Sequence, residues 1–348
     1  MSATSFASAR RATISDVAET AGVSVKTVSR VLNDAPNVKL ATRERVQHAI
    51  DALGYRPNSP ARMLAGRRTY LIGLIYNGVS SYITSIQQGV LAACRPAHYD
   101  LLIYPCDYTD PALIDHIRDF VEGPRVDGLI LVPPVGDVAS VCDFLNEIAI
   151  PNVAISRDPD NDADISVSTN DREISRRMVQ HLARLGHERI AFVCGHPDHK
   201  AMARRYLGYL DGLRDNELTV DEGIVFQGEN TYESGIDCGI RLMRLKERPT
   251  AVFCANDHMA AGVMTVAHDR RLSIPDDLSV AGFDNSPLAG QVWPRLTTID
   301  QPLEDMAKIA AEKLLGLVRG EAPSAGHHVV DAELIVRKST GPAPTDDG

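Results

Sequence analysis

The sequence predicts a small all-α head followed by an α/β core of two doubly wound subdomains. Three observations predict this arrangement. Residues 12–56 contain three short helical patterns separated by turn residues. From Tyr70 onward, short apolar runs alternate with helical stretches, as they do in parallel sheets. The charge divides at the same place, because residues 1–68 carry a net charge of +6 and the remainder −16, within a total of −10.

The composition is that of an ordinary globular protein. The chain has 348 residues, 44% hydrophobic and 24% charged, which suits two or three folding units. No apolar run reaches the roughly 18 residues of a membrane span, so we expect no membrane contact. Residues 1–11 lack the apolar stretch of a signal peptide and predict a disordered lead, so we expect a cytoplasmic protein. None of the six cysteines forms a CxxC pair, which favours buried, reduced thiols.

The first three elements have the pattern of a helix-turn-helix. Thr13 and Ser24 can each cap a helix, and Gly22 suits the positive φ of a tight turn between them. The third helix starts near Thr42 and ends at Gly54. Its apolar stripe has i, i+3, i+4, i+7 spacing: Val46, Ala49, Ile50 and Leu53. Together with the basic charge, this predicts a DNA-binding domain over residues 12–56.

Residues 57–69 predict a hinge. Pro60 suits the first position of a helix and Gly66 ends it, which leaves room for about two turns. So short a helix is unstable alone in water. We therefore expect it to order only against a partner.

The core, residues 70–340, has strands and helices in alternation, and residues 341–348 predict a disordered tail. The apolar runs that predict strands are Leu71–Tyr76, Leu101–Tyr104, Gly128–Val132, Val153–Ile155, Ile190–Cys194, Ala251–Cys254 and Leu278–Phe283. The predicted helices between them include Ser81–Arg95, Asp171–Gly186, Arg204–Asp215 and Asp257–Arg271. Polar residues follow several strands, and ligands of such sheets bind beyond the carboxyl ends of the strands. The core therefore predicts a ligand site at these ends.

Several motifs of this chain resemble the lactose/galactose repressor (LacI/GalR) family. In the head they are Thr13–Ala18, Ala21–Ser24 and Thr27–Asn33. In the hinge and core they are Gly54–Asn58, Ala61–Leu64, Leu185–His187, Arg205–Tyr209, Ala255–Asp257, Ser279–Asp284 and Leu296–Ile299. The resemblance covers roughly residues 12–340, and the head motif is its most specific part.

The resemblance implies a ligand-responsive transcriptional regulator. It implies a homodimer on a pseudo-palindromic operator, repressing carbohydrate-utilisation genes, with operator affinity changed allosterically by a small sugar. We expect no cofactor, no metal and no catalytic residue. The core would be similar to periplasmic sugar-binding proteins. One subdomain would comprise roughly residues 70–168 plus 300–325, and the other 169–299 plus 326–340.

The candidate DNA contacts lie at helix starts and in the hinge. Val25 can pack on a thymine methyl group, and Lys26 and Arg30 can reach guanine or phosphate. The start of the third helix suits phosphate. By the resemblance, Leu64 enters the minor groove as an apolar wedge. The full set is Ser15, Ser24, Val25, Lys26, Thr27, Ser29, Arg30, Asn33, Thr42, Arg43, Tyr55, Asn58, Ala61 and Leu64.

The candidate effector contacts are polar residues at strand ends and one aromatic residue. By the resemblance they are Tyr82, Arg157, Arg205, Asn256 and Asp284, and Asp107 is included because it follows a predicted strand. Arginine, aspartate and asparagine can satisfy the hydroxyls of a sugar, and a tyrosine can cover its apolar face. A nucleobase or sugar acid stays open as the ligand, because two of the six are arginines. Asn230 stands where some relatives have an aromatic ring.

Three alternatives compete with this interpretation. The segment Gly195–His199 has metal-type ligands, but neighbours in one loop rarely complete a metal site, so a cleft-rim loop is favoured. A solute-binding module of a transport system would share the core, but residues 13–33 and the missing export signal favour a regulator. The chain has none of the phosphate-loop, HExxH or nucleophile-elbow motifs that indicate an enzyme.

Overall fold

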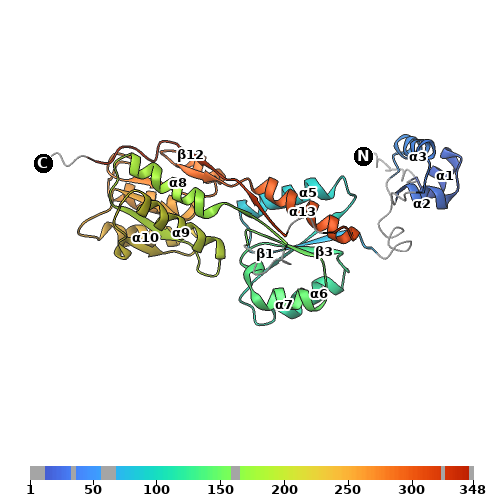
Figure 1. The fold of residues 1–348 in the computed structure, drawn as a ribbon, viewed down its shortest axis with the longest axis horizontal. Coiled ribbons are helices and arrows are strands. Elements are labelled where there is room, and N and C mark those ends of the chain that lie inside the picture. Colours follow the sequence, from blue (N-terminus) through green and yellow to red (C-terminus); the bar gives the residue numbers. More distant parts are fainter. Residues whose placement is uncertain (1–11, 33–36, 56–67, 158–164, 323–325, 345–348) are drawn as a thin grey trace, which may run out of the picture. The chain divides into compact units, whose positions relative to one another are not determined.

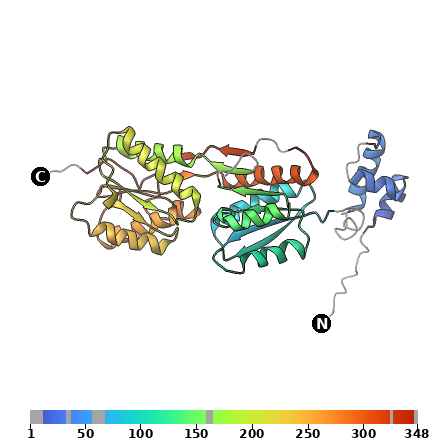
Figure 2. The same ribbon diagram turned by 60° about the horizontal axis from the view of Figure 1, so that its bottom comes forward.

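The computed structural model describes residues 12–32, 37–55, 68–157, 165–322 and 326–344. The chain divides into two compact units, Met1–Tyr70 and Leu71–Gly348. Figures 1 and 2 show the elements of each unit in two views.

The head is a three-helix bundle. Its helices are α1 (Ile14–Ala21), α2 (Val25–Leu32) and α3 (Leu40–Leu53). Thr13 and Asp16 form the reciprocal capping box of α1, and Gly22 and Gly54 end helices at φ 62° and 55°. The fully buried side chains of Val17, Val28 and Val46, one from each helix, form the centre of the bundle. The predicted all-α head is thus confirmed.

The first sheet of the core has six parallel strands in the order β11-β5-β4-β3-β1-β2. The strands are β1 (Leu71–Asn77), β2 (Asp100–Cys106), β3 (Gly128–Leu131), β4 (Asn152–Ile155), β5 (Ser166–Thr169) and β11 (His327–Val330). Figure 1 shows α5 (Ser81–Cys94) and α13 (Leu303–Arg319) on one face. The other face carries α6 (Leu113–Glu122) and α7 (Ala139–Glu147), preceded by the 3₁₀ turn η1 (Val135–Asp137).

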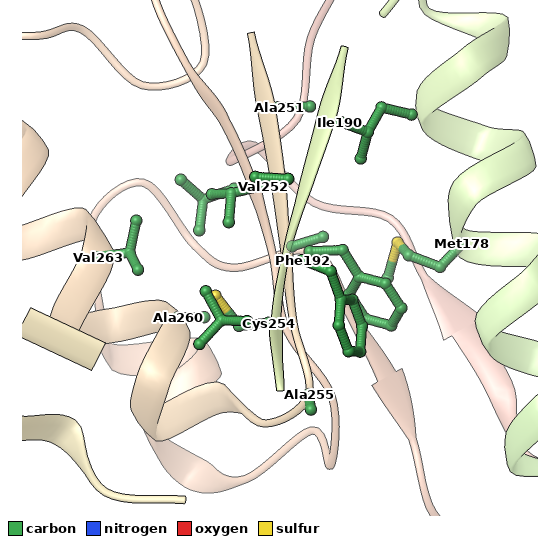
Figure 3. Packing of buried hydrophobic residues seen from close by; sticks show 14 of the residues in the cluster. Met178, Ile190, Phe192, Ala251, Val252, Cys254, Ala255, Ala260 and Val263 are labelled. Carbon is green, nitrogen blue, oxygen red and sulfur yellow. The ribbon is translucent and has the colours of Figure 1, made fainter. Parts of the chain in front are cut away.

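The second sheet has four parallel strands in the order β7-β6-β8-β9. They are β6 (Ile190–Cys194), β7 (Val225–Gln227), β8 (Ala251–Cys254) and β9 (Ser279–Ala281). The helices are α8 (Asp171–Arg184), α9 (Lys200–Asp215), α10 (Tyr232–Met243), α11 (Asp257–Asp269) and the short α12 (Pro287–Gln291), with the 3₁₀ turn η2 (Glu222–Ile224). Figure 3 shows Met178 and Phe192 packed on one side of the strands, and Ala260 and Val263 on the other. Two doubly wound subdomains are therefore confirmed as the architecture of the core.

The chain passes between the two sheets at a small antiparallel pair, β10 (Thr298–Asp300) with β12 (Glu333–Ile335). We expected residues 326–340 to belong to the second subdomain, and this is wrong for β11 (His327–Val330). Strand β11 instead pairs in parallel with β5 of the first sheet. A hydrogen bond of 2.8 Å between Ser166 Oγ and His327 Nδ1 reinforces this pairing.

Glycines let three pairs of helices approach closely. A Cβ at any of them would overlap a backbone oxygen of the partner helix. The contacts are Gly89 of α5 with Glu304 of α13, Gly208 of α9 with Arg172 of α8, and Gly262 of α11 with Tyr232 of α10. The sequence requires glycine here because of this close approach rather than because of a positive φ.

The C-terminal segment differs from the expected disordered tail as far as Pro344. Gly341 is buried, and its carbonyl oxygen lies 3.1 Å from Nε2 of the buried His187. Ala343 N donates to Leu185 O at 2.8 Å. The segment is held because it supplies partners to buried polar groups of the second subdomain. Residues 345–348 lie outside the described part of the chain.

The buried His187 predicts acid sensitivity of the core. Burial lowers the pKa of His187, and the Gly341 carbonyl opposes the shift. The folded core thus holds this ring neutral, whereas an unfolded histidine takes up a proton near pH 6.5. The neutral ring contributes fully to the free energy of unfolding above about pH 6.5. This contribution is lost as the pH falls towards the folded pKa, at up to about 1.4 kcal/mol per pH unit. Burial lowers the pKa values of His181 and His199 in the same sense.

Thermal unfolding measured between pH 7.5 and 5 should therefore show a falling melting temperature. His187→Gln should flatten the decline, although it lowers stability at pH 7.5 because three hydrogen-bonded neighbours lose their partner. The exposed His268 on α11 supplies the control, and His268→Gln should leave the slope unchanged. An identical pH slope in His187→Gln and the wild type would contradict this assignment.

No helix among the described residues is both long and apolar enough to span a lipid bilayer.

Candidate functional site

The core contains a cleft of about 970 Å³ between residues of both sheets. It lies where the strands end, as expected for doubly wound sheets. Asn77 ends β1, and Asn256 and Asp284 follow β8 and β9 closely. Tyr82 and Arg205 line the cleft from α5 and α9. Four of the six effector contacts expected from the sequence, Tyr82, Arg205, Asn256 and Asp284, thus line one cavity.

Arg205 is the centre of the buried floor of this cleft. Its Nε donates to Asp171 Oδ1 at 2.9 Å, and its Nη1 donates to Ala255 O at 2.5 Å and to Asp284 Oδ1 at 3.3 Å. The guanidinium lies 3.5 Å from the ring centroid of Phe283. Only 3% of the residue is exposed. The arginine is held in one orientation, because carboxylates on two sides and a ring beneath it restrain it.

Asp284 connects Arg205 to Gln301. Its Oδ1 also accepts a hydrogen bond of 2.6 Å from Gln301 Nε2. Burial raises the pKa of Asp284, and the neighbouring Arg205 opposes this shift. Gln301 lines the cleft and is 4% exposed, and its Oε1 is buried with no hydrogen-bond partner among the described residues. A buried acceptor of this kind is completed when a ligand brings a donor.

Tyr82 and Asn256 already have protein partners. Tyr82 Oη lies 2.8 Å from Ser156 Oγ, and burial raises the pKa of this tyrosine to about 12. Asn256 caps α11, since its Oδ1 accepts from Met259 N at 2.8 Å, and its Nδ2 donates to Asn230 O at 2.9 Å. Asn256 therefore shapes the wall of the cleft through a helix cap, with one amide hydrogen left for a ligand.

Two expected effector contacts lie elsewhere. Asp107 is exposed and outside the cleft lining, and its carboxylate accepts from the backbone and hydroxyl of Thr109 in a turn. It follows β2, which is the edge strand of its sheet. Arg157 is buried outside the lining, with Nη1 2.9 Å from Cys142 Sγ. Neither position supports the expected ligand contact.

The loop with His196 and His199 lies at the cleft, as the cleft-rim interpretation expects. It meets Tyr108, which belongs to the loop after β2 of the first sheet. Tyr108 Oη donates to Asp198 Oδ2 at 3.0 Å and lies 3.3 Å from His196 Nε2. The described residues hold no group of three or more His, Cys, Asp or Glu side chains arranged for a metal ion. The loop therefore joins the two sides of the cleft mouth.

The sequence interpretation missed Gln301 and Tyr108. Gln301 directly follows β10, whose three residues are too few to predict a strand from periodicity. The sequence analysis selected Asp107 as the polar residue after a predicted strand. The side chain that lines the cleft is the next one, Tyr108.

The head presents most of its candidate DNA contacts on its surface. Ser15, Ser24, Val25, Lys26 and Arg30 are exposed, and Thr27, Ser29, Thr42 and Arg43 are half-buried. Ser24 Oγ accepts from Thr27 N at 3.1 Å, which caps α2 and orients its first turn. Lys26 and Arg30 lie four residues apart and so share one face of α2. This helix has the exposed polar and basic residues that a recognition helix needs.

Tyr55 differs from the other head residues. It is 8% exposed and belongs to the hydrophobic core of the bundle, which gives it a packing role instead of the expected surface contact. Asn33, Asn58, Ala61 and Leu64 lie outside the described residues, so their expected contacts stay predictions.

Two family models match the chain. Residues 13–58 match the model described as bacterial regulatory proteins, lacI family, and residues 179–340 match a periplasmic binding protein-like domain. Catabolite control protein A of Priestia megaterium is 33% identical over 331 residues, which cover 94% of this chain and 99% of the relative. The HTH-type transcriptional repressor PurR of Vibrio atlanticus (strain LGP32) is 33% identical over 94% of this chain and 98% of its own length.

Solved structures agree over nearly the whole chain. The lac repressor dimer bound to operator and the anti-inducer ONPF has a TM-score of 0.74 and 28% identity, covering 95% of this chain and all of that one. A complex of the transcriptional regulator CelR with cellobiose has a TM-score of 0.72 and 29% identity, with 94% and 100% coverage. Head, core and full-length relatives agree, and this chain therefore belongs to the LacI family of bacterial regulatory proteins.

Proposed function

We propose that this transcriptional regulator represses carbohydrate-utilisation genes and that a small sugar in the cleft changes the affinity of its head for operator DNA. The observation that carries the proposal is the buried floor of Arg205, Asp284 and Gln301 in a chain that also has a basic helix-turn-helix head. Hydroxyl groups both donate and accept hydrogen bonds, so they suit a floor that offers an arginine, a carboxylate and an unpaired amide oxygen.

We infer that the regulator acts as a homodimer on a pseudo-palindromic operator. The solved lac repressor similar to this chain is a dimer bound to operator. In this proposal, Lys26 and Arg30 of each α2 face the major groove. Leu64 of each hinge enters the minor groove at the centre of the operator. A protein that binds chromosomal operators works in the cytoplasm, and its role requires no catalysis, cofactor or metal.

The cleft also suits transmission of a ligand signal. Its walls come from two subdomains joined by crossing segments, and contacts such as Tyr108 with Asp198 already bridge its mouth. A ligand that contacts both walls binds one relative position of the subdomains better than others, and so shifts the population towards that position. This shift would change the spacing of the two hinge starts near residues 67–70 in the dimer.

A solute-binding module of a transport system would need the same kind of cleft. The function of such a module does not require a DNA-binding head. The match of residues 13–58 to the lacI family model favours the regulator.

Operator binding in the presence of sugars tests the proposal. Labelled operator is titrated with the full-length protein, first alone and then with each sugar of a panel at up to 100 mM. We expect at least one sugar to change the dissociation constant about 5- to 150-fold, the usual range of allosteric coupling. A scrambled operator supplies the control. Sugars that bind the protein by calorimetry without changing operator affinity would contradict the effector role.

A further inference from the structure

We propose that the cleft selects polyhydroxylated ligands that are neutral or carry a protonated amine, and rejects those that carry a carboxylate or phosphate. This selection rests on the effector role proposed above and concerns the same site. It decides among the ligand classes that the sequence leaves open, because it excludes sugar acids.

The lining of the cleft carries an excess of negative charge. Among the described residues that line it, Arg205 is the one arginine or lysine. Six carboxylates line it, namely Glu229, Glu233, Asp284, Asp300, Glu304 and Asp305. Of these, Glu229, Glu233, Glu304 and Asp305 are exposed at the rim, where a ligand has to pass. A cleft with walls of one sign of charge raises the local concentration of the opposite sign and lowers that of its own.

The single cation does not compensate for this excess. The Arg205 guanidinium already binds two carboxylates, the buried one of Asp171 at 2.9 Å and the half-buried one of Asp284 at 3.3 Å. Arg204 lies outside the lining and contributes its charge to Asp171 at 3.2 Å. An anionic ligand would therefore have to compete with internal carboxylates for Arg205. It would also lie beside Asp284.

Most of the long helices that begin at the cleft have a capped or acidic amino end, whereas α9 and the short α12 begin there without a side-chain cap. The amino ends of α5, α10 and α11 reach the cleft and would attract negative charge if they were uncapped. Each is capped by its own side chain: Ser80 accepts from Ile83 N, Thr231 from Ser234 N, and Asn256 from Met259 N. Helix α13 begins at the cleft as well, and Glu304 and Asp305 occupy its first turn.

Two acceptors remain for a ligand beside the one amide hydrogen of Asn256, namely Gln301 Oε1 and the carboxylate of Asp284. Gln301 Nε2 donates to Asp284. The buried Oε1 of the same side chain has no donor among the described residues. The carboxylate of Asp284 accepts only. His199 lines the cleft too, and its pKa is lowered to about 4, mainly by burial, so it adds no positive charge near neutral pH. Hydroxyl and ammonium groups donate to such acceptors, whereas carboxylate and phosphate oxygens do not.

A charge series on one sugar skeleton tests the inference. Calorimetry with the full-length protein at pH 7 compares glucose, glucosamine, glucuronate and glucose 6-phosphate, and then galactose, galactosamine, galacturonate and galactose 6-phosphate. In the series that binds, we expect the uronate and the phosphate to bind at least about tenfold more weakly than the neutral sugar. The amino sugar should bind as tightly as the neutral sugar or more tightly. Raising the salt from 50 to 500 mM should reduce the differences, because the rim charges are screened.

A pair of variants on helix α13 then locates the effect. In the double variant Glu304→Gln/Asp305→Asn, the ratio of the uronate to the neutral-sugar dissociation constant should fall several-fold. Glu312→Gln, an exposed residue of the same helix outside the cleft, should leave this ratio unchanged. An unchanged ratio in the double variant would overturn the role of the rim.

The outcomes separate this inference from the proposed function. A uronate or sugar phosphate that binds as tightly as its neutral counterpart overturns the charge selection, even if it also changes operator affinity. Failure of every neutral and amino sugar to bind overturns the ligand class, while operator binding by the head would still stand. Binding with the expected ranking but without any effect on operator affinity supports the selection and contradicts the effector role instead.

Discussion

A fragment that begins at Tyr70 is expected to lose operator binding and to retain sugar binding. Removing the head takes away the exposed α2 residues and a net charge of +6, and leaves a core of strongly negative charge that DNA repels. We expect operator affinity to fall at least about a thousandfold, the lower end of the usual difference between specific and non-specific binding. Fluorescence anisotropy with labelled operator measures the loss.

Calorimetry with the same sugar measures what the fragment retains. The cleft lies wholly within Leu71–Gly348, so the sugar affinity of the fragment should match that of the full chain. Circular dichroism confirms that the fragment is folded. Operator affinity close to that of the full-length protein would show that the head is not the DNA-binding part.

Arg205→Ala is expected to destabilise the core and abolish sugar binding. The substitution leaves the half-buried Asp284 without its cation, and leaves Asp171, only 1% exposed, with Arg204 alone. Breaking a buried ion pair in this way costs about 3–5 kcal/mol. Chemical denaturation measures the free energy of unfolding, and calorimetry measures sugar binding.

Helix α9 supplies the control for Arg205. Arg214 forms an exposed pair with Asp211 at 3.3 Å, and Arg214→Ala should cost about 0–1 kcal/mol and leave sugar binding intact. If Arg205→Ala does not fold, Asp284→Asn keeps the shape of the site and should weaken the sugar by about 1–3 kcal/mol. Wild-type sugar affinity in both Arg205→Ala and Asp284→Asn would show that the ligand binds elsewhere.

The sequence predicts the elements whose signals are local. Thr13, Ser24 and Gly54 cap helices where the turn chemistry places them, because capping depends on neighbours three or four residues away. The long buried strands β1 and β6 are predicted well, since a run of apolar residues suffices. The sequence analysis does not predict strands β5, β7, β10, β11 and β12, because they are short and lack an apolar run, and their pairing partners decide their structure.

The site residues were likewise predictable where the signal is local to the sequence. Asn256 and Asp284 line the cleft because they follow β8 and β9, whose carboxyl ends meet the same edge of the second sheet. Asp107 does not line the cleft, because its carboxylate accepts hydrogen bonds from Thr109 in the turn after β2, and the direction of this turn is not visible in the sequence. Arg157 follows Ser156, whose φ of 57° turns the chain at the end of β4, and such a turn is equally invisible. Gln301 depends on β10 and was missed with it.

The glycines at the helix crossings determine how the core can move. Gly89, Gly208 and Gly262 bring backbone against backbone where the paired helices cross, so no side chain lies between the two helices at these points. We therefore expect sliding of these helices past one another to cost more than a rotation of one whole subdomain against the other. We expect the motion of the core to occur mainly in the segments that connect the two subdomains. A force applied at the cleft should thus pass through them nearly undiminished, as a rotation of one body against the other.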